Sequence, residues 1–565
     1  MIKKRIKNLK NTFKKFDIDG YVIPKNDEYF TEYSKINRLK IISNFSGSAG
    51  VAVILKNKNY LFTDGRYTIQ SQIESGKNFK IIDYDKLLNC NLFKNKILGI
   101  DPQLFTYEQV KKFFLKNNKV RFINENLIDG IKKQKINDSD LFFSLNKSIT
   151  GECSNSKIGK ISNYLKKNKA DFLFVSAPEN VAWILNIRGA DVPNSPIPNS
   201  RLIITKNKKI ILIGKIQKCK NLIKKNIIKF NELIDPRKFK NTILNLRGKN
   251  FIIDKKSCSI FYEDLIKLKF KIIKKEDPTY HLKSIKNQTE INHMIKSHIS
   301  DGVALTKFIY WIKNINKKKI TEVHAQNKLE QFRKKNKNYL YPSFDTIAGT
   351  GKNGAIVHYR AKQENCEVIK RNDILLCDSG GQYKYGTTDV TRTISFSNSN
   401  QNIKNIFTKV LKGHISVATI DLKENNIGKK IDAKARKFLN ESNLDYAHGT
   451  GHGVGFFLNV HEGPQSLSKI NRIKIKEGMI LSNEPGYYKK NKFGIRIENL
   501  VYVKKNRNKI FFENLTMAPI EKDLINFKLL TSFEKKYLFK YHIDVYSKIS
   551  KYLNLKEKKW LASLI

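Results

Sequence analysis

The sequence contains few cysteines, no long apolar run and few acidic residues for its length. The six cysteines among 565 residues form no CxxC pair, which excludes a disulfide framework or a thiolate zinc knuckle and favours free thiols in a reducing compartment. No stretch approaches the roughly 20 apolar residues of a membrane span. The basic N-terminus, MIKKRIKNLKNTFKKF, lacks the apolar core and the cleavage site of a targeting peptide. We therefore expect a cytoplasmic protein that binds no membrane and begins with a helix.

The shortage of acidic residues leaves a formal net charge of +56, from 107 basic against 51 acidic side chains. Such an excess usually indicates nucleic acid or an anionic membrane as a partner. Here, however, Lys far outnumbers Arg and is spread along the whole chain, whereas recognition of phosphates and bases favours clustered Arg. We interpret the charge as a composition bias, with attraction to acidic surfaces as a side effect, and expect no nucleic-acid partner.

The hydrophobic content of 40% is sufficient for globular cores, and the length predicts two to four domains. The first ~145 residues alternate strand-like runs such as GYVIP and GVAVILKN with helical stretches such as YEQVKKFFLKN, a pattern typical of an α/β domain. After a polar stretch, a second alternation with the runs ADFLFVSA, RLIITKN and NFIIDK repeats this style without visible sequence identity. The two segments predict similar α/β domains in tandem.

A long helix is predicted where this alternation ends. Asn287 and Glu290 have the spacing of a helix cap, and an apolar stripe follows at Ile291, Met294, Ile295, Ile299, Val303 and Leu305. A second helix is expected through residues 320 to 335, and Gly-rich strands and hairpins come next. From LTMAPIEKDLINF onward the chain is largely helical, with aromatic and aliphatic anchors in YLFKYHIDVYSKISKYL that we expect to pack onto the preceding domain.

Five residues able to bind metal lie in order over the last third of the chain. They are Asp378 in LLCDSGGQY, Asp389 in TTDVTRT, His452 in HGTGHGVG, Glu484 in SNEPGYY and Glu498 in GIRIENLVYV. Four carboxylates and one imidazole form an oxygen-rich ligand set, which suits a pair of ions such as manganese better than a structural zinc. A site of that kind carries out hydrolysis.

The carboxylates fall in two predicted hairpins. Asp378 and Asp389 flank SGGQYKYGTT, whose glycines permit a tight return, and opposed residues on paired strands lie close enough, at ~5 Å, to share a metal pair. Glu484 and Glu498 repeat the arrangement, with Arg496 and Glu498 on one face of an otherwise apolar strand. Each hairpin alone also fits a blander interpretation, a solvated turn for the aspartates and an edge strand with one wet face for the glutamates.

Four of only ten histidines lie near the carboxylate motifs, namely His358, His448, His452 and His461. A single histidine is more often structural than catalytic, but this clustering favours a functional role. The small residues of HGTGHGVG let the backbone come close and leave His448 and His452 able to face a cavity.

The ordered set Asp, Asp, His, Glu, Glu in these local words resembles the pita-bread metallopeptidases of family M24B, relatives of methionine aminopeptidase and prolidase. Other sequence motifs resemble the long, three-domain form of Xaa-Pro aminopeptidase (aminopeptidase P). NFSGSAGVAVI and FTDGRYTIQ resemble its first domain, and VAWILNIRGADVPNSP resembles its second. HGTGHGVGFFLNVHEGP resembles its catalytic domain, and LTMAPIEKDLIN resembles its C-terminal extension. The resemblance covers essentially the whole chain.

This resemblance implies an α/β protein with an α+β catalytic domain. Two creatinase-like α/β domains would occupy residues 1–147 and 148–280, a pita-bread catalytic domain with a dinuclear metal site residues 281–510, and a helical extension packed on it residues 511–565. It also implies a homodimer.

The resemblance assigns roles residue by residue. Asp378 would chelate one ion, His452 and Glu484 the other, and Asp389 and Glu498 would bridge them around a hydroxide, with Glu484 also the general base. His358 and His461 match histidines that hold the scissile peptide and stabilise the tetrahedral intermediate. His448 matches a position lining the substrate pocket, and Arg496 matches the arginine next to the second glutamate.

The implied reaction is release of the N-terminal residue from peptides with proline in second position, with two divalent ions, for which we expect Mn²⁺. An Xaa-Pro bond has no N–H, so pockets that bond this proton cannot use it. Two alternatives stay open: a prolidase, which shares the five ligands but takes dipeptides, and a metal-free pita-bread module that binds peptides or histones. The length and the tail favour the aminopeptidase over the first, and the complete ligand set argues against the second.

Overall fold

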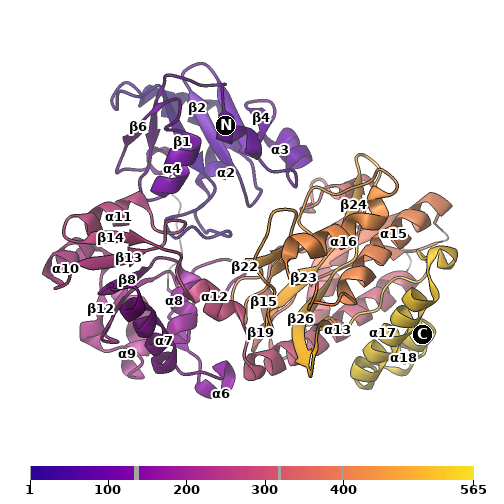
Figure 1. Ribbon diagram of the computed structural model, residues 1–565. Coiled ribbons are helices and arrows are strands. Elements are labelled where there is room, and N and C mark those ends of the chain that lie inside the picture. Colours follow the sequence, from indigo (N-terminus) through magenta and orange to yellow (C-terminus); the bar gives the residue numbers. More distant parts are fainter. Residues whose placement is uncertain (1, 133–138, 316–319, 398) are drawn as a thin grey trace. The chain divides into compact units, whose positions relative to one another are not determined.

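The computed structural model describes residues 2–132, 139–315, 320–397 and 399–565, and the chain folds into two compact units. The first unit comprises residues 1–280 and the second residues 281–565. Figure 1 labels their helices and strands. Each unit is described separately below.

The first unit begins with a six-stranded mixed sheet in the order β4-β3-β2-β1-β5-β6. Strands β1 and β2, and β2 and β3, are antiparallel, whereas the β3–β4, β1–β5 and β5–β6 pairs are parallel. The strands are β1 (Gly20–Pro24), β2 (Val51–Leu55), β3 (Asn59–Thr63), β4 (Lys80–Asp83), β5 (Ile97–Ile100) and β6 (Lys119–Phe122), and the helices are α1 (Ile2–Asn11), α2 (Arg38–Ser43), α3 (Thr68–Ser75), α4 (Tyr107–Phe113) and α5 (Leu127–Ile131).

A second six-stranded sheet of the same unit has the order β12-β11-β10-β8-β13-β14. Its pairs repeat the parallel and antiparallel pattern of the first sheet position by position. The strands are β8 (Phe172–Val175), β10 (Arg201–Thr205), β11 (Ile210–Ile213), β12 (Leu233–Ile234), β13 (Asn250–Ile253) and β14 (Lys271–Lys274), with a separate short pair, β7 (Phe143–Ser144) and β9 (Ile187–Arg188). The helices are α6 (Lys147–Thr150), α7 (Ser154–Lys167), α8 (Pro178–Leu185), α9 (Lys220–Lys224), α10 (Phe239–Asn245) and α11 (Ile260–Lys267). The prediction of two similar α/β domains in tandem is confirmed.

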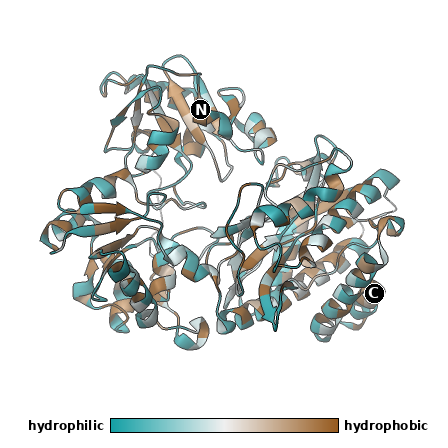
Figure 2. Ribbon diagram, in the orientation of Figure 1, coloured by the Kyte–Doolittle hydropathy of each residue, from teal (hydrophilic) through white to brown (hydrophobic). Residues whose placement is uncertain are grey.

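The central strands of both sheets are apolar because they are covered on both faces. Every residue of β2 and of β8 is buried, and a continuous apolar run is what such a strand requires. Figure 2 shows these strands in brown, with teal residues gathered on the helices and loops around them. Each sheet therefore carries its own hydrophobic core.

The second unit opens on two long helices. Helix α13 (Gln288–Asn314) follows the short α12 (Thr279–Ser284), and α14 (Glu322–Lys334) comes next. At the start of α13 the Asn287 side chain accepts the backbone N–H of Glu290, whose carboxylate accepts the backbone N–H of Asn287, so the predicted cap is confirmed. Of the predicted apolar stripe, Ile291, Met294 and Leu305 are buried and the other three residues are half-buried.

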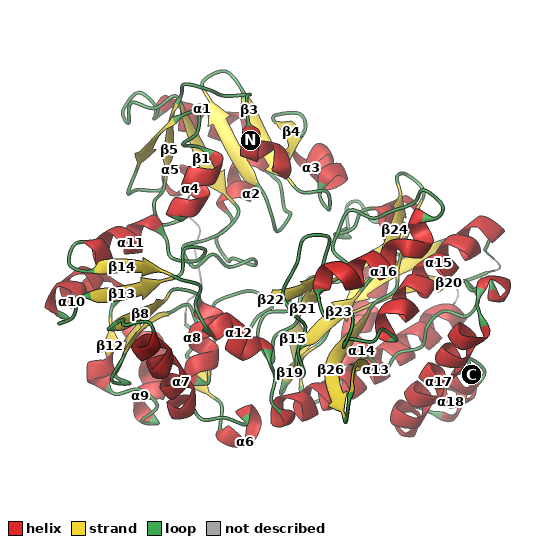
Figure 3. Cartoon of the chain, viewed as in Figure 1, coloured by secondary structure: helices red, strands yellow, loops and turns green. Residues whose placement is uncertain are grey.

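The strands of the second unit form several small sheets, which Figure 3 shows in yellow among the helices. Three sheets have the orders β15-β18-β19, β16-β17-β20 and β22-β21-β23-β26-β27, and β24 pairs with β25. The bounds are β15 (Tyr339–Pro342), β16 (Ile347–Thr350), β17 (Ile374–Ser379), β18 (Gly381–Tyr383), β19 (Gly386–Thr387), β20 (Val390–Ser395), β21 (Gly451–Gly453), β22 (Glu462–Leu467), β23 (Ile480–Asn483), β24 (Gly486–Lys489), β25 (Phe493–Arg496), β26 (Asn499–Asn506) and β27 (Lys509–Asn514).

Two pairs of helices cover these sheets. Leu305 of α13 and Leu329 of α14 share a core with Leu375 of β17 and Ile394 of β20. Helices α15 (Gln401–Ala418) and α16 (Gly428–Asn440) instead contribute to a core with strands β22, β23 and β26. Each pair of helices thus covers its own set of carboxylate-bearing strands.

The C-terminal residues pack onto this unit as expected. Helices α17 (Ser532–Ile549) and α18 (Leu555–Ala562) bury Leu538, Tyr541 and Leu561 in a core that also contains Val410 of α15 and Ile495 of β25. In the described part of the chain, no helix combines the length and the apolar character that crossing a membrane requires.

Candidate metal centre

Glu484 and Glu498 lie opposite each other where two strand ladders meet. In the ladder of β23 and β26 Asn483 faces Asn499, and in the ladder of β24 and β25 Gly486 faces Arg496. The two ladders have the same register. A hydrogen bond from the Ile497 N–H to the Pro485 carbonyl (3.3 Å) joins the strands between them. Directly opposed side chains of a strand pair lie on the same face, so the two carboxylates project together.

Asp378 and Asp389 are diagonal neighbours and do not face each other directly. Asp378 of β17 pairs with Thr391 of β20, and Asp389 immediately precedes β20. The expected direct opposition is therefore wrong, because the tip ladder of β18 and β19 continues the register of β17 and β20, and this register places Asp389 two residues before the partner of Asp378. Diagonal neighbours still share a face within reach of both side chains.

The imidazole of His452 lies among these carboxylates. Its Nε2 is 3.4 Å from Asp389 Oδ2 and 3.6 Å from Glu484 Oε1. Its Nδ1 is 3.0 Å from the carbonyl of Gly453, so the tautomer with the proton on Nδ1 leaves the Nε2 lone pair pointing at the acids. The ring of His461 packs edge-on against that of His452, with 4.3 Å between the ring centroids.

The possible ligand atoms form three groups, and within each group all atoms lie within 4.8 Å of one another. They are Asp378 with Asp389 and Glu498, His452 with Glu484 and Glu498, and Asp389 with His452 and His461. The structure thus brings together all five sequence-predicted metal ligands and adds His461 at the edge of the set.

Two carboxylate oxygens show that this group fits cations. Asp378 Oδ1 and Glu498 Oε1 are buried and have no hydrogen-bond partner among the described residues. A buried carboxylate oxygen without a partner destabilises the folded protein, and a hard divalent cation is the ligand that such oxygens prefer. The residues present therefore fit a pair of bound metal ions.

The pKa values of the acids respond to the same crowding. Burial, and then the nearby carboxylates Asp378 and Glu484, raise the pKa of Asp389 well above its ordinary value. Burial, and then Asp389 and Glu484, do the same to the pKa of Glu498. Burial also raises the pKa of Glu484, while His452 and Arg496 lower it. Positive charge placed between these groups would favour their ionised forms.

Arg496 supplies one positive charge at this centre. Its guanidinium donates to Asp378 Oδ2 (2.6 Å), to Thr391 Oγ1 (3.1 Å) and to the hydroxyl of Tyr488 (2.6 Å). Tyr488, whose pKa burial raises to about 12, also lies 2.8 Å from Nε2 of His448. His448 Nδ1 is 2.8 Å from the Gly449 carbonyl, so both ring nitrogens of His448 contact groups of the protein.

The sequence did not assign a role to three residues that hold the ligands or the side chains beside them. Thr391 donates its hydroxyl to Glu498 Oε2 (2.8 Å), and Ser482 donates to Glu484 Oε1 (3.1 Å) while accepting the His452 N–H (2.9 Å). Tyr488 is the third. The one available signal was position, since Thr391 lies two residues after Asp389 in TTDVTRT, and Ser482 and Tyr488 lie in SNEPGYY.

His358 belongs to none of the three ligand groups. It lies half-buried in the turn after a short 3₁₀ helix, Gly351–Ala355, beside Tyr359. Tyr359 donates its hydroxyl to Glu322 Oε2 (2.7 Å), and the same fully buried carboxylate accepts from the Thr350 N–H (2.8 Å), the Glu367 N–H (2.9 Å) and the amide of Asn353 (3.0 Å). Glu322 therefore fixes the loop that carries His358.

Family models match nearly the whole chain. The model for metallopeptidase family M24 matches residues 292–505, and the model for the C-terminal region of these peptidases matches residues 509–564. Two models of the creatinase/prolidase N-terminal domain match residues 5–128 and 133–290.

Named relatives and solved structures agree with these models. A probable Xaa-Pro aminopeptidase P of Laccaria bicolor is 36% identical over 99% of this chain and 92% of that protein. The X-prolyl aminopeptidase of Caenorhabditis elegans, described as a cytosolic enzyme with a dinuclear active site, matches with a TM-score of 0.92 and 27% identity over 100% of this chain and 99% of that chain. The prolidase of Pyrococcus furiosus matches with a TM-score of 0.51 and 25% identity over 63% of this chain and 98% of that chain.

The sequence resemblance to the long form of Xaa-Pro aminopeptidase is confirmed, because proteins of that name match from end to end. The fold class is confirmed by the same match. Both the models and the relatives lead to one assignment: this chain belongs to metallopeptidase family M24, with two creatinase-like domains before the peptidase domain.

Proposed function

We propose that this protein is an Xaa-Pro aminopeptidase, which hydrolyses the bond between an N-terminal residue and a proline in second position with the help of two divalent metal ions. The observation that carries the proposal is the buried group of Asp378, Asp389 and Glu498 in a chain that resembles X-prolyl aminopeptidase over its full length. One ligand oxygen of each residue lies within 4.8 Å of the others, and two carboxylate oxygens of the group have no hydrogen-bond partner among the described residues.

Five residues would hold the ions. Asp378 would bind one ion, His452 and Glu484 would bind the other, and Asp389 and Glu498 would contribute ligands to both. The ligand groups support two neighbouring ion sites, since Asp378 and Asp389 form one group with Glu498, and His452 and Glu484 form another with Glu498. Oxygen ligands with one imidazole suit Mn²⁺, and we propose it as the physiological ion.

When bound, the two ions supply Lewis acidity that polarises the scissile carbonyl and makes water nucleophilic near neutral pH. Glu484 takes up the proton of the attacking water. A raised pKa suits a carboxylate to that role, and the Ser482 hydroxyl orients it. Arg496 fixes the orientation of Asp378 through a 2.6 Å hydrogen bond to its carboxylate.

The histidines handle the peptide. His461, edge-on to His452, hydrogen-bonds the oxygen on which negative charge develops, and His358 holds the scissile peptide from its own loop. His448 lines the substrate pocket and orients Tyr488, which in turn orients Arg496. Because the bond before proline lacks an N–H, the pocket has to fit the pyrrolidine ring in place of bonding that proton.

A prolidase is the second candidate, since the prolidase of Pyrococcus furiosus shares the fold of part of this chain. That likeness covers 63% of the chain, whereas the likeness to the aminopeptidase of Caenorhabditis elegans covers all of it. The coverage favours the aminopeptidase.

Three further properties follow from the same likeness. We propose a cytoplasmic enzyme, because the Caenorhabditis elegans protein is cytosolic and the six cysteines of this chain are free. We propose a homodimer, and domain limits of 1–147, 148–280, 281–510 and 511–565. The pairing of β7 with β9 makes the residues just before the first limit part of the second domain's structure.

The proposal is tested by incubating the full chain with Mn²⁺ and either a tripeptide with proline second or the matching Xaa-Pro dipeptide. We expect cleavage of the tripeptide, loss of cleavage with a chelator and near-total loss in Asp389→Asn. Cleavage of the dipeptide alone would move the assignment to prolidase. Peptide binding without turnover and without metal would overturn the enzyme assignment.

A further inference from the structure

Arg392 of β20 is a fully buried cation close to the metal centre that the mechanism above does not use. Among the described residues its guanidinium donates only to uncharged oxygens, and burial lowers its pKa from the ordinary arginine value. A buried guanidinium without a carboxylate partner is stable only if every donor finds an acceptor. The position of those acceptors therefore determines which elements Arg392 holds together.

On one side, Arg392 binds the backbone that carries the metal ligands. Its guanidinium donates to the carbonyl of Glu498 (2.6 Å) and to the carbonyl of Thr391 (2.8 Å). Thr391 is the residue whose hydroxyl holds the Glu498 carboxylate, and its carbonyl also accepts the Glu498 N–H (3.1 Å). Arg392 thus contacts the backbone of the ligand and of the residue that orients the ligand.

On the other side, Arg392 binds the C-terminal region. It donates to the carbonyls of Ala518 (2.8 Å) and Pro519 (2.8 Å) and to the hydroxyl of Tyr541 on α17 (3.0 Å). Tyr541 in turn donates to the Ala518 carbonyl at 2.7 Å. About half of the acceptors that Arg392 needs therefore come from residues after β27.

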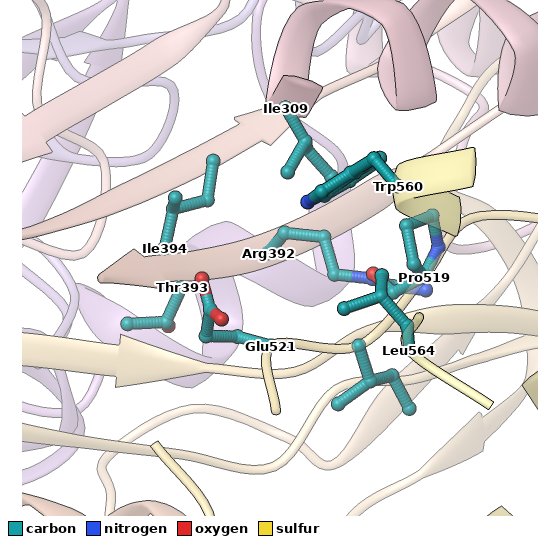
Figure 4. Close-up of a pocket in the computed structure, with 9 residues that line it drawn as sticks. Ile309, Arg392, Thr393, Ile394, Pro519, Glu521, Trp560 and Leu564 are labelled. Atoms are coloured by element: carbon teal, nitrogen blue, oxygen red, sulfur yellow. The ribbon is translucent and has the colours of Figure 1, made fainter. Parts of the chain in front are cut away.

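Figure 4 shows the same junction from the pocket beside it. Arg392 lies along β20 with its guanidinium directed toward Pro519, and Trp560 and Leu564 from the end of the chain line the pocket together with Ile309 of α13. The C-terminal helices thus cover the side of β20 on which Arg392 lies.

We propose that Arg392 is a positioning residue through which the C-terminal region holds Glu498 in place for metal binding. This inference rests on the proposed function only in taking Glu498 as a metal ligand. The C-terminal region then has a second role besides packing onto the domain, because its carbonyls and the Tyr541 hydroxyl keep Arg392 oriented toward the strand that carries Glu498. Groups that orient metal ligands from behind typically change metal affinity by about 10- to 100-fold when they are removed.

The test is a calorimetric titration of the metal-free, full-length protein with Mn²⁺, without peptide. Arg392→Lys keeps the charge but loses the forked geometry that reaches both sides, and we expect its Mn²⁺ affinity to fall by about 10-fold or more. We expect a smaller but measurable fall in Tyr541→Phe. The matched control is Tyr546→Phe, which removes a hydroxyl from the same helix at a residue that is not a partner of Arg392, and its affinity should equal that of the wild type.

Thermal unfolding of the metal-free variants accompanies each titration, because a purely structural role would lower stability and leave the affinity unchanged. Wild-type affinity in Arg392→Lys, or equal losses in Tyr541→Phe and Tyr546→Phe, would overturn the inference. A wild type that binds Mn²⁺ but cleaves no Xaa-Pro peptide would instead overturn the proposed function alone. A wild type that binds no Mn²⁺ would overturn the metal assignment on which the inference rests.

Discussion

Two groups of buried carboxylates in the peptidase domain are satisfied in different ways. At the metal centre, Asp378, Asp389 and Glu498 converge, and two of their oxygens have no hydrogen-bond partner among the described residues. At the hub under the His358 loop, a single carboxylate, that of Glu322, accepts hydrogen bonds from two backbone N–H groups, an amide and a tyrosine hydroxyl.

The difference teaches how a buried acid can be assigned a role. Glu322 is complete without a cation, so it stabilises the fold by tying segments together. The acids of the metal centre are incomplete and repel one another, so they weaken the metal-free fold and are explained only by a bound ligand. Neutralising a carboxylate should therefore have opposite effects on stability at the two places.

The largest expected effect is on metal binding in Glu498→Gln. An amide donates where a cation needs a second oxygen, so we expect kcat/KM on an Xaa-Pro tripeptide to fall by at least about 100-fold, the upper range for even an indirect partner of a metal. Mn²⁺ affinity should fall with it. Steady-state kinetics and calorimetry measure both.

The matched control is Glu534→Gln. Glu534 is likewise a buried glutamate, but it lies in the first turn of α17, where it caps the helix and pairs with Lys412 at 2.7 Å. The kcat/KM of this variant should stay within about twofold of the wild type, since Glu534 belongs to none of the three ligand groups. A Glu498→Gln enzyme as active as this control would refute the metal role of Glu498.

The next effect is a loss of stability in Glu322→Gln. The new NH₂ group would meet the N–H donors that Glu322 now accepts, so we expect the free energy of unfolding of the metal-free protein to fall by about 2 kcal/mol. Urea unfolding followed by tryptophan fluorescence measures it, with Glu534→Gln again as the comparison.

A double-mutant cycle with Tyr359→Phe tests whether the loss belongs to the hub. Tyr359 and Glu322 share one hydrogen bond, so their separate effects should add to more than the effect of the double variant. Strict additivity, or an unchanged stability in Glu322→Gln, would show that the two segments are not held through this carboxylate.

The smallest effect is a gain in stability of metal-free Glu498→Gln over metal-free wild type, about 1 kcal/mol at pH 8. The pKa of Glu498 is raised in the folded protein. Its contribution to stability is therefore fully present below the unfolded pKa and is lost as pH rises through the folded pKa. The variant lacks this loss, so its advantage should shrink as pH falls from 8 to 5.

Urea unfolding in the presence of a chelator at several pH values measures this advantage. A variant less stable than the wild type at pH 8, or an advantage that widens on acidification, would contradict the claim that the acids repel one another. Either result would mean that Glu498, like Glu322, stabilises the metal-free fold.

Much of the fold could be predicted because it follows from local patterns. The apolar runs of β2 and β8 gave buried strands, and Asn287 with Glu290 gave the start of α13. The identical strand order of the first two sheets was predictable only as a similarity of style, since strand order depends on pairing between distant segments.

The ligand set could be predicted because the residue types themselves carry the chemistry. The exact pairing could not, since the position of the turn sets the register of this hairpin, and that register places Asp389 diagonally to Asp378. The roles of Arg392 and Glu322 could not be predicted from the sequence for another reason. Their partners lie far along the chain, as Pro519 does from Arg392, and a buried charge leaves no local pattern.

The common register of the ladders on either side of Glu484 and Glu498 has a consequence for protein engineering. The turn at Lys490, Asn491 and Lys492 is exposed and lies beyond the last ladder pair, Lys489 with Phe493. Residues inserted there lengthen the loop without shifting either strand, whereas deletion of one residue beside Glu484 would turn its side chain to the opposite face. The tip of this hairpin is thus the place to attach a fluorophore that reports on the metal centre without disturbing it.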